Sequence, residues 1–350
     1  MDPAALRILD ANFNRAREGV RVLEEHARFA LEDSELTERL KELRHDLAEL
    51  AGVLAGPRAL ECRDTPGDVG TTISTPSEMH RGSVAEVAAA AAGRLSESLR
   101  CIEEYGKLVD ASAAVRVESL RYRLYAIEQE MFVTSPRRRR LREALLHVLI
   151  TESLTRGDWL TVCRKVLAAG ADVIQLREKQ LADRELLDRA LQLRELTRAH
   201  DALLFINDRP DIARLAGADG VHVGQTDLPV SEVRRIAGPT MLVGKSTHSA
   251  EEIAAALEEK PDYLAVGPMF ASPTKPEVSV QGLALLAQAA RVTDLPIVAI
   301  GGITATNAEQ LRARPPFALA VCQAVVAATD PAAVVLLLRA GMKKHGGSAA

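Results

Sequence analysis

A short charged cluster in the second half of the chain has the residue types and spacing that phosphate chemistry requires. The segment VIQLREKQ (173–180) is an apolar run that ends in Gln175, Arg177 and Lys179. Successive side chains of a strand point to opposite faces, so these three share one face and Glu178 points to the other. Two cations and an amide at one place suit a ligand rich in phosphate.

Two carboxylates follow the next two apolar runs and could share one cation. Asp208 comes directly after Asn207, and Asp227 comes after the following run. Two carboxylates together with substrate phosphate oxygens are a usual way to hold Mg²⁺, so we predict Mg²⁺ as the cofactor. For Asp208, which precedes an expected helix, a helix N-cap is the alternative.

Further polar groups lie in the segment GPMFASPTK (267–275). Ser272, Thr274 and Lys275 offer two hydroxyls and a movable charge, which suits a second anion site. The string GKST (244–247) imitates the end of a nucleotide-binding P-loop. A proline stands where that motif needs its first glycine, so we interpret the string as unrelated to nucleotide binding.

These residues must be positioned by a regular alternation of elements that begins near residue 147. Eight apolar runs are expected to be strands: 147–151, 173–177, 203–207, 220–223, 241–246, 263–267, 296–300 and 317–322. Helices are expected after them at 158–169, 183–199, 209–216, 229–236, 249–259, 281–291, 304–313 and 330–341. Eight such units predict an α/β fold of the (β/α)8 TIM-barrel type. A doubly wound sheet would want a glycine-rich turn after the first strand, which 151–158 lacks.

A barrel of this type carries its active site at the C-terminal ends of the strands, where the polar residues gather. Gly301 and Gly302, followed by a helix near Thr304, match the phosphate site common after strands 7 and 8. His222, inside the fourth strand, is interpreted as a packed histidine. For His248, catalysis and helix capping both stay open.

The first half of the chain has a helical period instead. One apolar stripe of a long helix comprises Leu6, Leu9, Phe13, Ala16, Val20, Leu23, Ala27 and Ala30. RAREGVRVLEE (15–25) aligns with RLSESLRCIEE (94–104), and LRHDL (43–47) aligns with LRYRL (120–124). We interpret this half as two related helical hairpins, with chance similarity of Arg/Glu-rich helices as the alternative.

Two segments of unusual composition interrupt these patterns. Residues 63–83 are rich in Gly, Pro, Thr and Ser, which suits either a phosphate-binding loop or an ordinary surface loop. Residues 134–143, TSPRRRRLRE, are interpreted as a solvated linker. The expected domains are therefore 1–133, all-helical, and 144–345, the barrel.

Composition limits the class of protein. The net charge of −4 and the absence of a wider basic field argue against nucleic-acid partners. No stretch has the length and hydrophobicity of a signal peptide or a membrane span, so a cytoplasmic location without membrane association is expected. The dispersed cysteines suggest free thiols, and assembly into a homo-oligomer stays open.

Taken together, the motifs of the second half resemble those of thiamine-phosphate synthases. They are QLREK (175–179), IND (206–208), HVGQTD (222–227), GKS (244–246), GP…SPTK (267–275), QG (281–282) and AIGGIT (299–304). The resemblance implies a (β/α)8 barrel that joins a hydroxymethylpyrimidine diphosphate to a thiazole phosphate, forming thiamine phosphate and releasing pyrophosphate. It implies a dissociative reaction assisted by Mg²⁺, with small molecules as substrates.

The resemblance also implies roles for individual residues. The ligands of the pyrimidine diphosphate would be Gln175, Arg177, Lys179, Asn207 and Lys275. Ser246 would face the pyrimidine, and Asp208 and Asp227 would bind Mg²⁺. The ligands of the thiazole phosphate would be Ser272, Thr274, Gly302, Cys322 and Gln323. Among these residues, the catalytic ones would be Lys275, Arg177 and Ser246.

Three positions depart from the family pattern. Ser272 stands where the loop usually has Thr, which keeps the hydroxyl, and Gln323 stands where a Ser is common. The usual G-A-D-G before the last strand is replaced by RPPFA (314–318). Contact of the thiazole phosphate with Gln323 through the backbone would preserve binding, whereas a required hydroxyl would not.

The helical half resembles a domain that precedes this synthase in some bacteria and is associated with phosphorylation of hydroxymethylpyrimidine phosphate. DANFNRAREGVRVLEEHARFAL (10–31) and RDTPGDVG (63–70) carry the likeness. Candidate site residues there are Arg15, Glu18, Arg63 and Asp68. Two other functions remain as alternatives, namely a thiazole tautomerase that uses His248 and a phosphate-ligand sensor without turnover.

Overall fold

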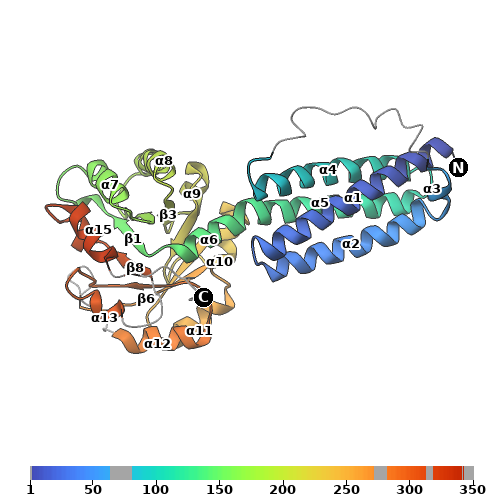
Figure 1. The fold of residues 1–350 in the computed structure, drawn as a ribbon. Coiled ribbons are helices and arrows are strands. Elements are labelled where there is room, and N and C mark those ends of the chain that lie inside the picture. Colours follow the sequence, from blue (N-terminus) through green and yellow to red (C-terminus); the bar gives the residue numbers. More distant parts are fainter. Residues whose placement is uncertain (1, 64–80, 272–281, 313–317, 341, 343–350) are drawn as a thin grey trace. The chain divides into compact units, whose positions relative to one another are not determined.

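The computed structural model describes residues 2–63, 81–271, 282–312, 318–340 and 342. The chain divides into two compact units, residues 1–136 and 137–350, and each is described by itself (Figure 1). Within the described residues no helix is long and apolar enough to cross a membrane. The four cysteines are free thiols.

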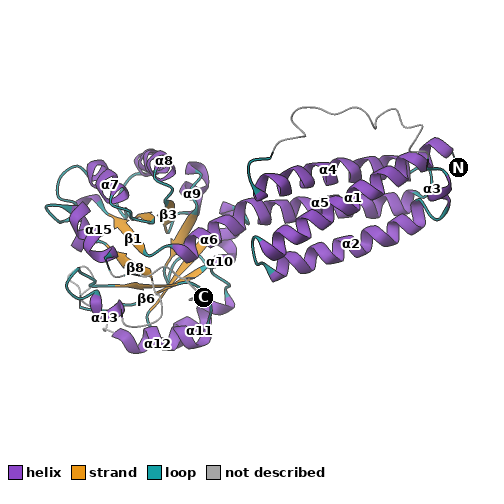
Figure 2. Cartoon of the chain, viewed as in Figure 1, coloured by secondary structure: helices purple, strands orange, loops and turns teal. Residues whose placement is uncertain are grey.

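The described part of the first unit consists mainly of helices, as Figure 2 shows. They are α1 (Pro3–Phe29), α2 (Ser34–Leu54), α3 (Arg58–Glu61), α4 (Val84–Gly106), α5 (Ala111–Gln129) and the π-helical turn η2 (Glu130–Thr134). Side-chain oxygens cap the N-termini of the four long helices at Asp2, Asp33, Ser83 and Asp110. The predicted apolar stripe is buried from Leu6 to Ala27. Ala30 is exposed, because α1 ends one residue before it.

The two expected hairpins are present, and their ion pairs repeat with the sequence. In the first hairpin, Arg44 Nε donates to Glu24 Oε2 at 3.0 Å. In the second, Arg121 Nε donates to Glu103 Oε2 at the same distance. Both carboxylates are buried, and both arginines occupy matching positions of the repeat. Chance similarity of charged helices does not account for equivalent buried pairs.

The second unit is a closed barrel of eight parallel strands in sequential order. The strands are β1 (Leu146–Ile150), β2 (Val173–Leu176), β3 (Leu203–Asn207), β4 (Gly220–Val223), β5 (Leu242–Thr247), β6 (Tyr263–Val266), β7 (Ile297–Ile300) and β8 (Ala318–Val321). The main outer helices are α7 (Trp159–Ala168), α8 (Asp183–Ala199), α9 (Pro210–Ala216), α10 (Val230–Ala237), α11 (Ala250–Glu258), α12 (Gly282–Val292) and α15 (Pro331–Arg339). The predicted barrel is confirmed, and the open-sheet alternative is wrong.

The structure differs from the expected helices near the end of the chain. The helix expected at 304–313 is reduced to α13 (Glu309–Arg312), and residues before it form a turn. A short helix, α14 (Gln323–Val326), directly follows β8 and was not expected.

Two glycines allow the barrel interior to hold large rings. A Cβ added to Gly220 would lie 2.2 Å from the Phe205 ring, and one added to Gly244 would lie 2.1 Å from the Tyr263 ring. The Phe205 and Tyr263 rings meet edge to face with centroids 5.5 Å apart. Glycine at these inward positions of β4 and β5 therefore gives the rings of β3 and β6 their space.

Aspartates placed just before alternate strands fasten the N-terminal end of the barrel. Asp172, Asp219 and Asp262 precede β2, β4 and β6. Their carboxylates accept backbone N–H groups at the start of β1, β3 and β5. Each also pairs with an arginine of an outer helix, namely Arg339, Arg194 and Arg234. Neighbouring strands are thus tied by charge-assisted hydrogen bonds.

The basic run expected to be a solvated linker is the helix α6 (Ser135–Glu143). Arg138 Nε donates to Asp262 Oδ1 at 2.9 Å, and Arg137 lies 3.4 Å from Asp219. The expectation that this run is solvated was therefore wrong for Arg137 and Arg138, because they have buried carboxylate partners in the barrel unit.

Candidate active site

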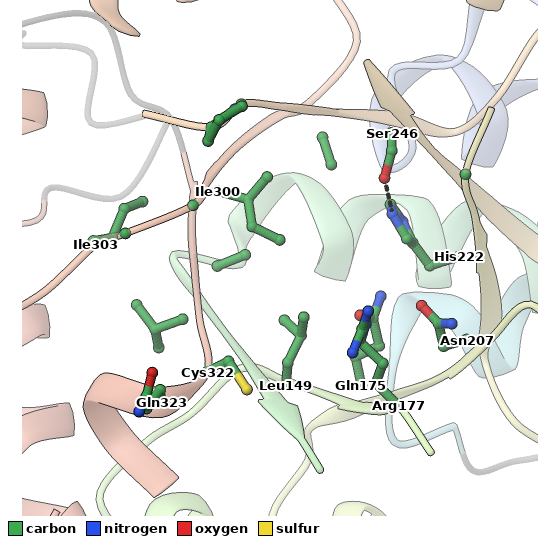
Figure 3. Close-up of a pocket in the computed structure, with 18 of the residues that line it drawn as sticks. Leu149, Gln175, Arg177, Asn207, His222, Ser246, Ile300, Ile303, Cys322 and Gln323 are labelled. Atoms are coloured by element: carbon green, nitrogen blue, oxygen red, sulfur yellow. Dashed lines mark hydrogen bonds between the residues drawn. The ribbon is translucent and has the colours of Figure 1, made fainter. Parts of the chain in front are cut away.

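A cavity of about 500 Å³ opens at the C-terminal ends of the barrel strands. Polar side chains from β2 to β5 line one part, where Figure 3 labels Gln175, Arg177, Asn207, His222 and Ser246. Apolar groups line another part, which includes Leu149, Ile300 and Ile303. The cavity can therefore hold a charged group and an aromatic ring side by side.

The side chains at the charged end of β2 separate into cavity-lining and other residues, as the strand alternation predicted. Gln175, Arg177 and Lys179 all line the cavity, whereas Glu178 does not. Among the described residues, no carboxylate forms an ion pair with Arg177. Glu178 accepts the backbone N–H of Glu152 at 2.6 Å and lies 3.7 Å from Arg189. An unpaired guanidinium in a cavity is suited to an anionic ligand.

The two aspartates lie together in the same cavity. Burial raises the pKa of Asp208, and the hydrogen bond and negative charge of Asp227 raise it further. Burial also acts to raise the pKa of Asp227. The Gly224 N–H at 2.7 Å, the bond with Asp208 and the charges of Lys179 and Lys245 outweigh it, so that pKa is lowered. The two carboxylates therefore differ in their affinity for a proton, Asp208 having the higher.

The surroundings of Asp208 exclude the helix-capping alternative. Arg209, not Asp208, is the cap residue of α9, and Asp208 has the left-handed backbone angle φ of 62°. Its carboxylate lies 3.5 Å from the Lys179 ammonium and faces the cavity.

The carboxylate pair fits a divalent cation only if a ligand completes the coordination. The described residues contain no group of three or more His, Cys, Asp or Glu side chains that could hold a metal. Deprotonated carboxylates are hard oxygen ligands, and Mg²⁺ typically takes one or two of them together with phosphate oxygens and water. The residues present therefore fit Mg²⁺ held jointly with a phosphorylated ligand.

His222 is both packed and part of the cavity wall, so its interpretation as a merely packed side chain was incomplete. Its Nε2 lies 2.8 Å from Ser246 Oγ, and its Nδ1 lies 2.8 Å from the Tyr263 hydroxyl (Figure 3 shows the first contact). Gln225 donates to the backbone oxygen of Ser246 at 2.5 Å. Ser246 is thus held from two sides.

His248 lines the cavity next to Ser246 but its ring is partnered. Nδ1 lies 3.0 Å from Glu252 Oε2, and the same oxygen accepts the His248 backbone N–H at 2.7 Å. Ser249, not His248, caps α11 with its side chain.

The ends of β7 and β8 form the opposite part of the cavity. Gly301, Gly302, Cys322 and Gln323 all line it. A Cβ on Gly302 would lie 2.5 Å from the Phe270 backbone oxygen, so only glycine fits this crossing of the two loops. The expected longer helix after Gly302 is absent, and the short α14 with Gln323 stands close to this end instead.

Several predicted residues lie outside the described part of the chain, and others were missed. Ser272, Thr274, Lys275 and most of the segment RPPFA (314–318) are not described. The apolar wall was missed because its members look like ordinary strand residues. The contact of Tyr263 with His222 was missed because it joins residues 41 positions apart.

The helical unit brings only part of its predicted site together. Arg63 donates twice to the Asp10 carboxylate, at 2.7 Å each. Arg15 and Glu18 are exposed on α1, and Asp68 lies outside the described residues. Asp10 was missed, although it begins the DANFN motif that carried the resemblance.

Comparison with known proteins assigns both units. Residues 146–325 match the family model described as thiamine monophosphate synthase, and residues 7–130 match that of the ThiD2 family. The thiamine-phosphate synthase of Rhodopirellula baltica is 45% identical over 87% of this chain and 84% of its own. That of Gloeobacter violaceus is 40% identical over 94% of both chains.

A solved structure agrees with the barrel. Thiamine phosphate pyrophosphorylase from Pyrococcus furiosus is 34% identical, with a TM-score of 0.54, and covers 57% of this chain and 96% of its own. The cavity at the strand ends, the matching family model and the full-length relatives lead to one conclusion: this chain belongs to the thiamine-phosphate synthase family of transferases.

Proposed function

We propose that the barrel joins the diphosphate of hydroxymethylpyrimidine to a thiazole phosphate and releases pyrophosphate. The observation that carries the proposal is Arg177, which has no carboxylate partner among the described residues, beside the Asp208–Asp227 pair in a cavity with an adjoining apolar wall. Neither the tautomerase nor the sensor alternative is favoured by the relatives, which are named as synthases.

The pyrimidine substrate would place its diphosphate at the charged end of the cavity. Gln175, Arg177, Lys179 and Asn207 would bind its oxygens, and Ser246 would contact the ring. Mg²⁺, when held by Asp208, Asp227 and the diphosphate, would supply positive charge that stabilises the leaving group. Arg177 and Lys179 add to this stabilisation because charge grows on the pyrophosphate oxygens as the bond breaks. By the family resemblance, Lys275 would also stabilise the leaving pyrophosphate.

The departure of pyrophosphate would leave a methylene cation on the pyrimidine, which the thiazole nitrogen captures. Leu149, Ile300 and Ile303 would limit access of water to this cation. Gly302, Cys322 and Gln323 would hold the thiazole phosphate together with Ser272 and Thr274, which sets the thiazole ring opposite the pyrimidine.

The test is to mix both substrates with Mg²⁺ and to measure thiamine phosphate and pyrophosphate. We expect both products in equal amounts, and their loss when the metal is chelated. Asp227→Ala should abolish turnover. Asp201→Ala, at a carboxylate 90% exposed on the barrel surface, is the matched control and should not. A folded protein that forms no thiamine phosphate refutes the proposal.

We also propose that the helical unit phosphorylates hydroxymethylpyrimidine phosphate and so supplies the barrel's substrate. The match of residues 7–130 to the ThiD2 family and the ordered Arg63–Asp10 pair support this. Residues 1–136 should form the diphosphate when given ATP, Mg²⁺ and the monophosphate, and Arg63→Ala should lower the rate. Absence of diphosphate from the folded unit and from the full chain would refute it.

A further inference from the structure

Tyr263, His222 and Ser246 form a chain of hydrogen bonds that runs from the barrel interior to the cavity. The Tyr263 hydroxyl lies 2.8 Å from His222 Nδ1, and His222 Nε2 lies 2.8 Å from Ser246 Oγ. Each member comes from a different strand, β6, β4 and β5. Figure 3 shows the outer part of the chain, with His222 below Ser246 at the cavity wall.

The hydroxyl at the inner end of the chain needs an acceptor for its proton. Tyr263 is buried, and this burial raises the pKa of its phenol, so the hydroxyl keeps its proton at all ordinary pH values. A buried O–H that donates to nothing costs about 1–3 kcal/mol. Among the described residues, the hydrogen-bond partner of this hydroxyl is His222 Nδ1. Tyr263 therefore donates to Nδ1.

This donation sets the proton of the imidazole. Because Nδ1 accepts a hydrogen bond, a neutral His222 carries its proton on Nε2. Nε2–H then donates to Ser246 Oγ, which becomes an acceptor in this contact. The hydroxyl proton of Ser246 is left to point to an acceptor in the cavity, which Ser246 lines.

The chain is also fixed mechanically. The Tyr263 ring lies over Gly244, where any Cβ would be 2.1 Å from it, and stacks with the His222 ring at a centroid distance of 5.5 Å. The Phe205 ring meets it edge to face. On the other side, Gln225 holds the backbone oxygen of Ser246. The direction of the Ser246 hydroxyl is thus set by packed neighbours.

We propose that Tyr263 and His222 are positioning residues that commit Ser246 to donate its hydrogen bond to a ring nitrogen of the pyrimidine substrate. The inference rests on the proposed function of the barrel. A pyrimidine ring offers its two nitrogens as hydrogen-bond acceptors. A serine committed to donation selects a ring nitrogen, and so favours a nitrogen heterocycle over a ring of equal shape without such an acceptor.

The first test determines which nitrogen of His222 carries the proton. Protein labelled with ¹⁵N-histidine is examined by NMR near neutral pH, and the His222 signals are assigned from their loss in His222→Gln. We expect an unprotonated Nδ1 and a protonated Nε2 in the wild type. Tyr263→Phe should yield a mixture of tautomers, whereas Tyr105→Phe, which removes an exposed hydroxyl of the helical unit, should change nothing.

The second test reads the consequence for the substrate. Tyr263→Phe should raise the KM of the pyrimidine diphosphate about tenfold, as expected for one hydrogen bond, and leave the KM of the thiazole phosphate unchanged. Both substitutions act through the Ser246 hydroxyl. The double variant Tyr263→Phe, Ser246→Ala should therefore lose no more affinity for the pyrimidine diphosphate than Ser246→Ala alone.

The outcomes separate the inference from the function it rests on. A wild-type His222 protonated on Nδ1, an unchanged pyrimidine KM in Tyr263→Phe, or additive losses in the double variant would each overturn the inference. A wild-type protein that makes no thiamine phosphate would overturn the proposed function instead. If Tyr263→Phe does not fold, the wild-type tautomer alone decides.

Discussion

Arg177 and Glu178 are neighbours in sequence but occupy different environments. Arg177 lines the cavity and has no carboxylate partner in the part of the chain that the structure describes. Glu178 accepts the Glu152 backbone N–H and lies near Arg189. One carries a role in ligand binding, and the other orders the loop that follows β1.

Replacing each residue with alanine should therefore give different kinetics. Arg177→Ala should lower kcat/KM for the pyrimidine diphosphate by about 10–150-fold, the value of a charge-assisted hydrogen bond of roughly 1.5–3 kcal/mol. Glu178→Ala should change it far less. Steady-state rates with the pyrimidine diphosphate varied measure both, and equal effects would mean that the two faces are assigned wrongly.

His147 is a buried imidazole inside the barrel that faces no solvent. Its Nε2 has no hydrogen-bond partner among the described residues, and burial lowers its pKa to about 3. In the unfolded chain the value is about 6.5. Between these two values the unfolded chain binds a proton that the folded chain does not, so the folded state loses stability as the pH falls.

His147→Met should remove this part of the pH dependence. On going from pH 7 to pH 5, the wild type should lose about 2 kcal/mol more unfolding free energy than the variant. Urea denaturation at the two pH values measures the difference. Parallel losses in both proteins would show that His147 does not titrate in this way.

The limit of prediction at this scale is clear from His222. Its sequence context, a strand, correctly indicated a packed side chain. Its partners Tyr263 and Ser246 are 41 and 24 residues away, and neither spacing carries a signal without the register of the barrel. The β2 cluster was predictable because its residues are adjacent and alternate along one strand.

At the scale of elements, the aspartates that precede β2, β4 and β6 each connect two neighbouring strands to an outer helix. Asp219 is 2% exposed, receives the Leu204 N–H at 2.9 Å, and receives Arg194 Nη1 at 2.6 Å. Its removal leaves the half-buried Arg194 guanidinium and the buried Leu204 N–H without their shared partner, which is costly.

Asp219→Ala should lower the stability of the barrel by about 3–5 kcal/mol. Asp201→Ala, at an exposed carboxylate that also pairs with an arginine, should cost about 0–1 kcal/mol. Urea unfolding followed by the fluorescence of Trp159 in α7 measures both variants. Equal midpoints for the two would contradict this role of the aspartates.

The eight strands were predictable because buried parallel strands are short, continuous apolar runs between helical patterns. The helix α6 was not, since four consecutive arginines look solvated until Asp219 and Asp262 are known to lie beside them. The short α13 and α14 were also beyond sequence reasoning, because helices of one turn carry no period.

At the scale of the whole molecule, the chain has separate cores. One apolar cluster lies within the helical unit. In the barrel unit, a second cluster lies between the strands and the outer helices, and a third fills the inside of the barrel. The single tryptophan, Trp159, belongs to the barrel, so its fluorescence reports on one unit only.

A substitution in the core of one unit should therefore destabilise that unit alone. Leu99→Ala, in the helical core, should cost that unit about 2–5 kcal/mol and leave the fluorescence transition of Trp159 and the synthase rate unchanged. Leu264→Ala, in the barrel core, should shift the fluorescence transition instead. Circular dichroism follows both units, and a fluorescence shift in Leu99→Ala would show that the units unfold together.

The repeated hairpins are also joined by a pair of residues at equivalent positions. Asp46 of α2 and Arg123 of α5 occupy equivalent positions of the repeat, and they pair with each other. Two hairpins of identical sequence would carry the same charge at both positions and could not form this ion pair. The contact between the two hairpins at this point therefore depends on the difference between their sequences.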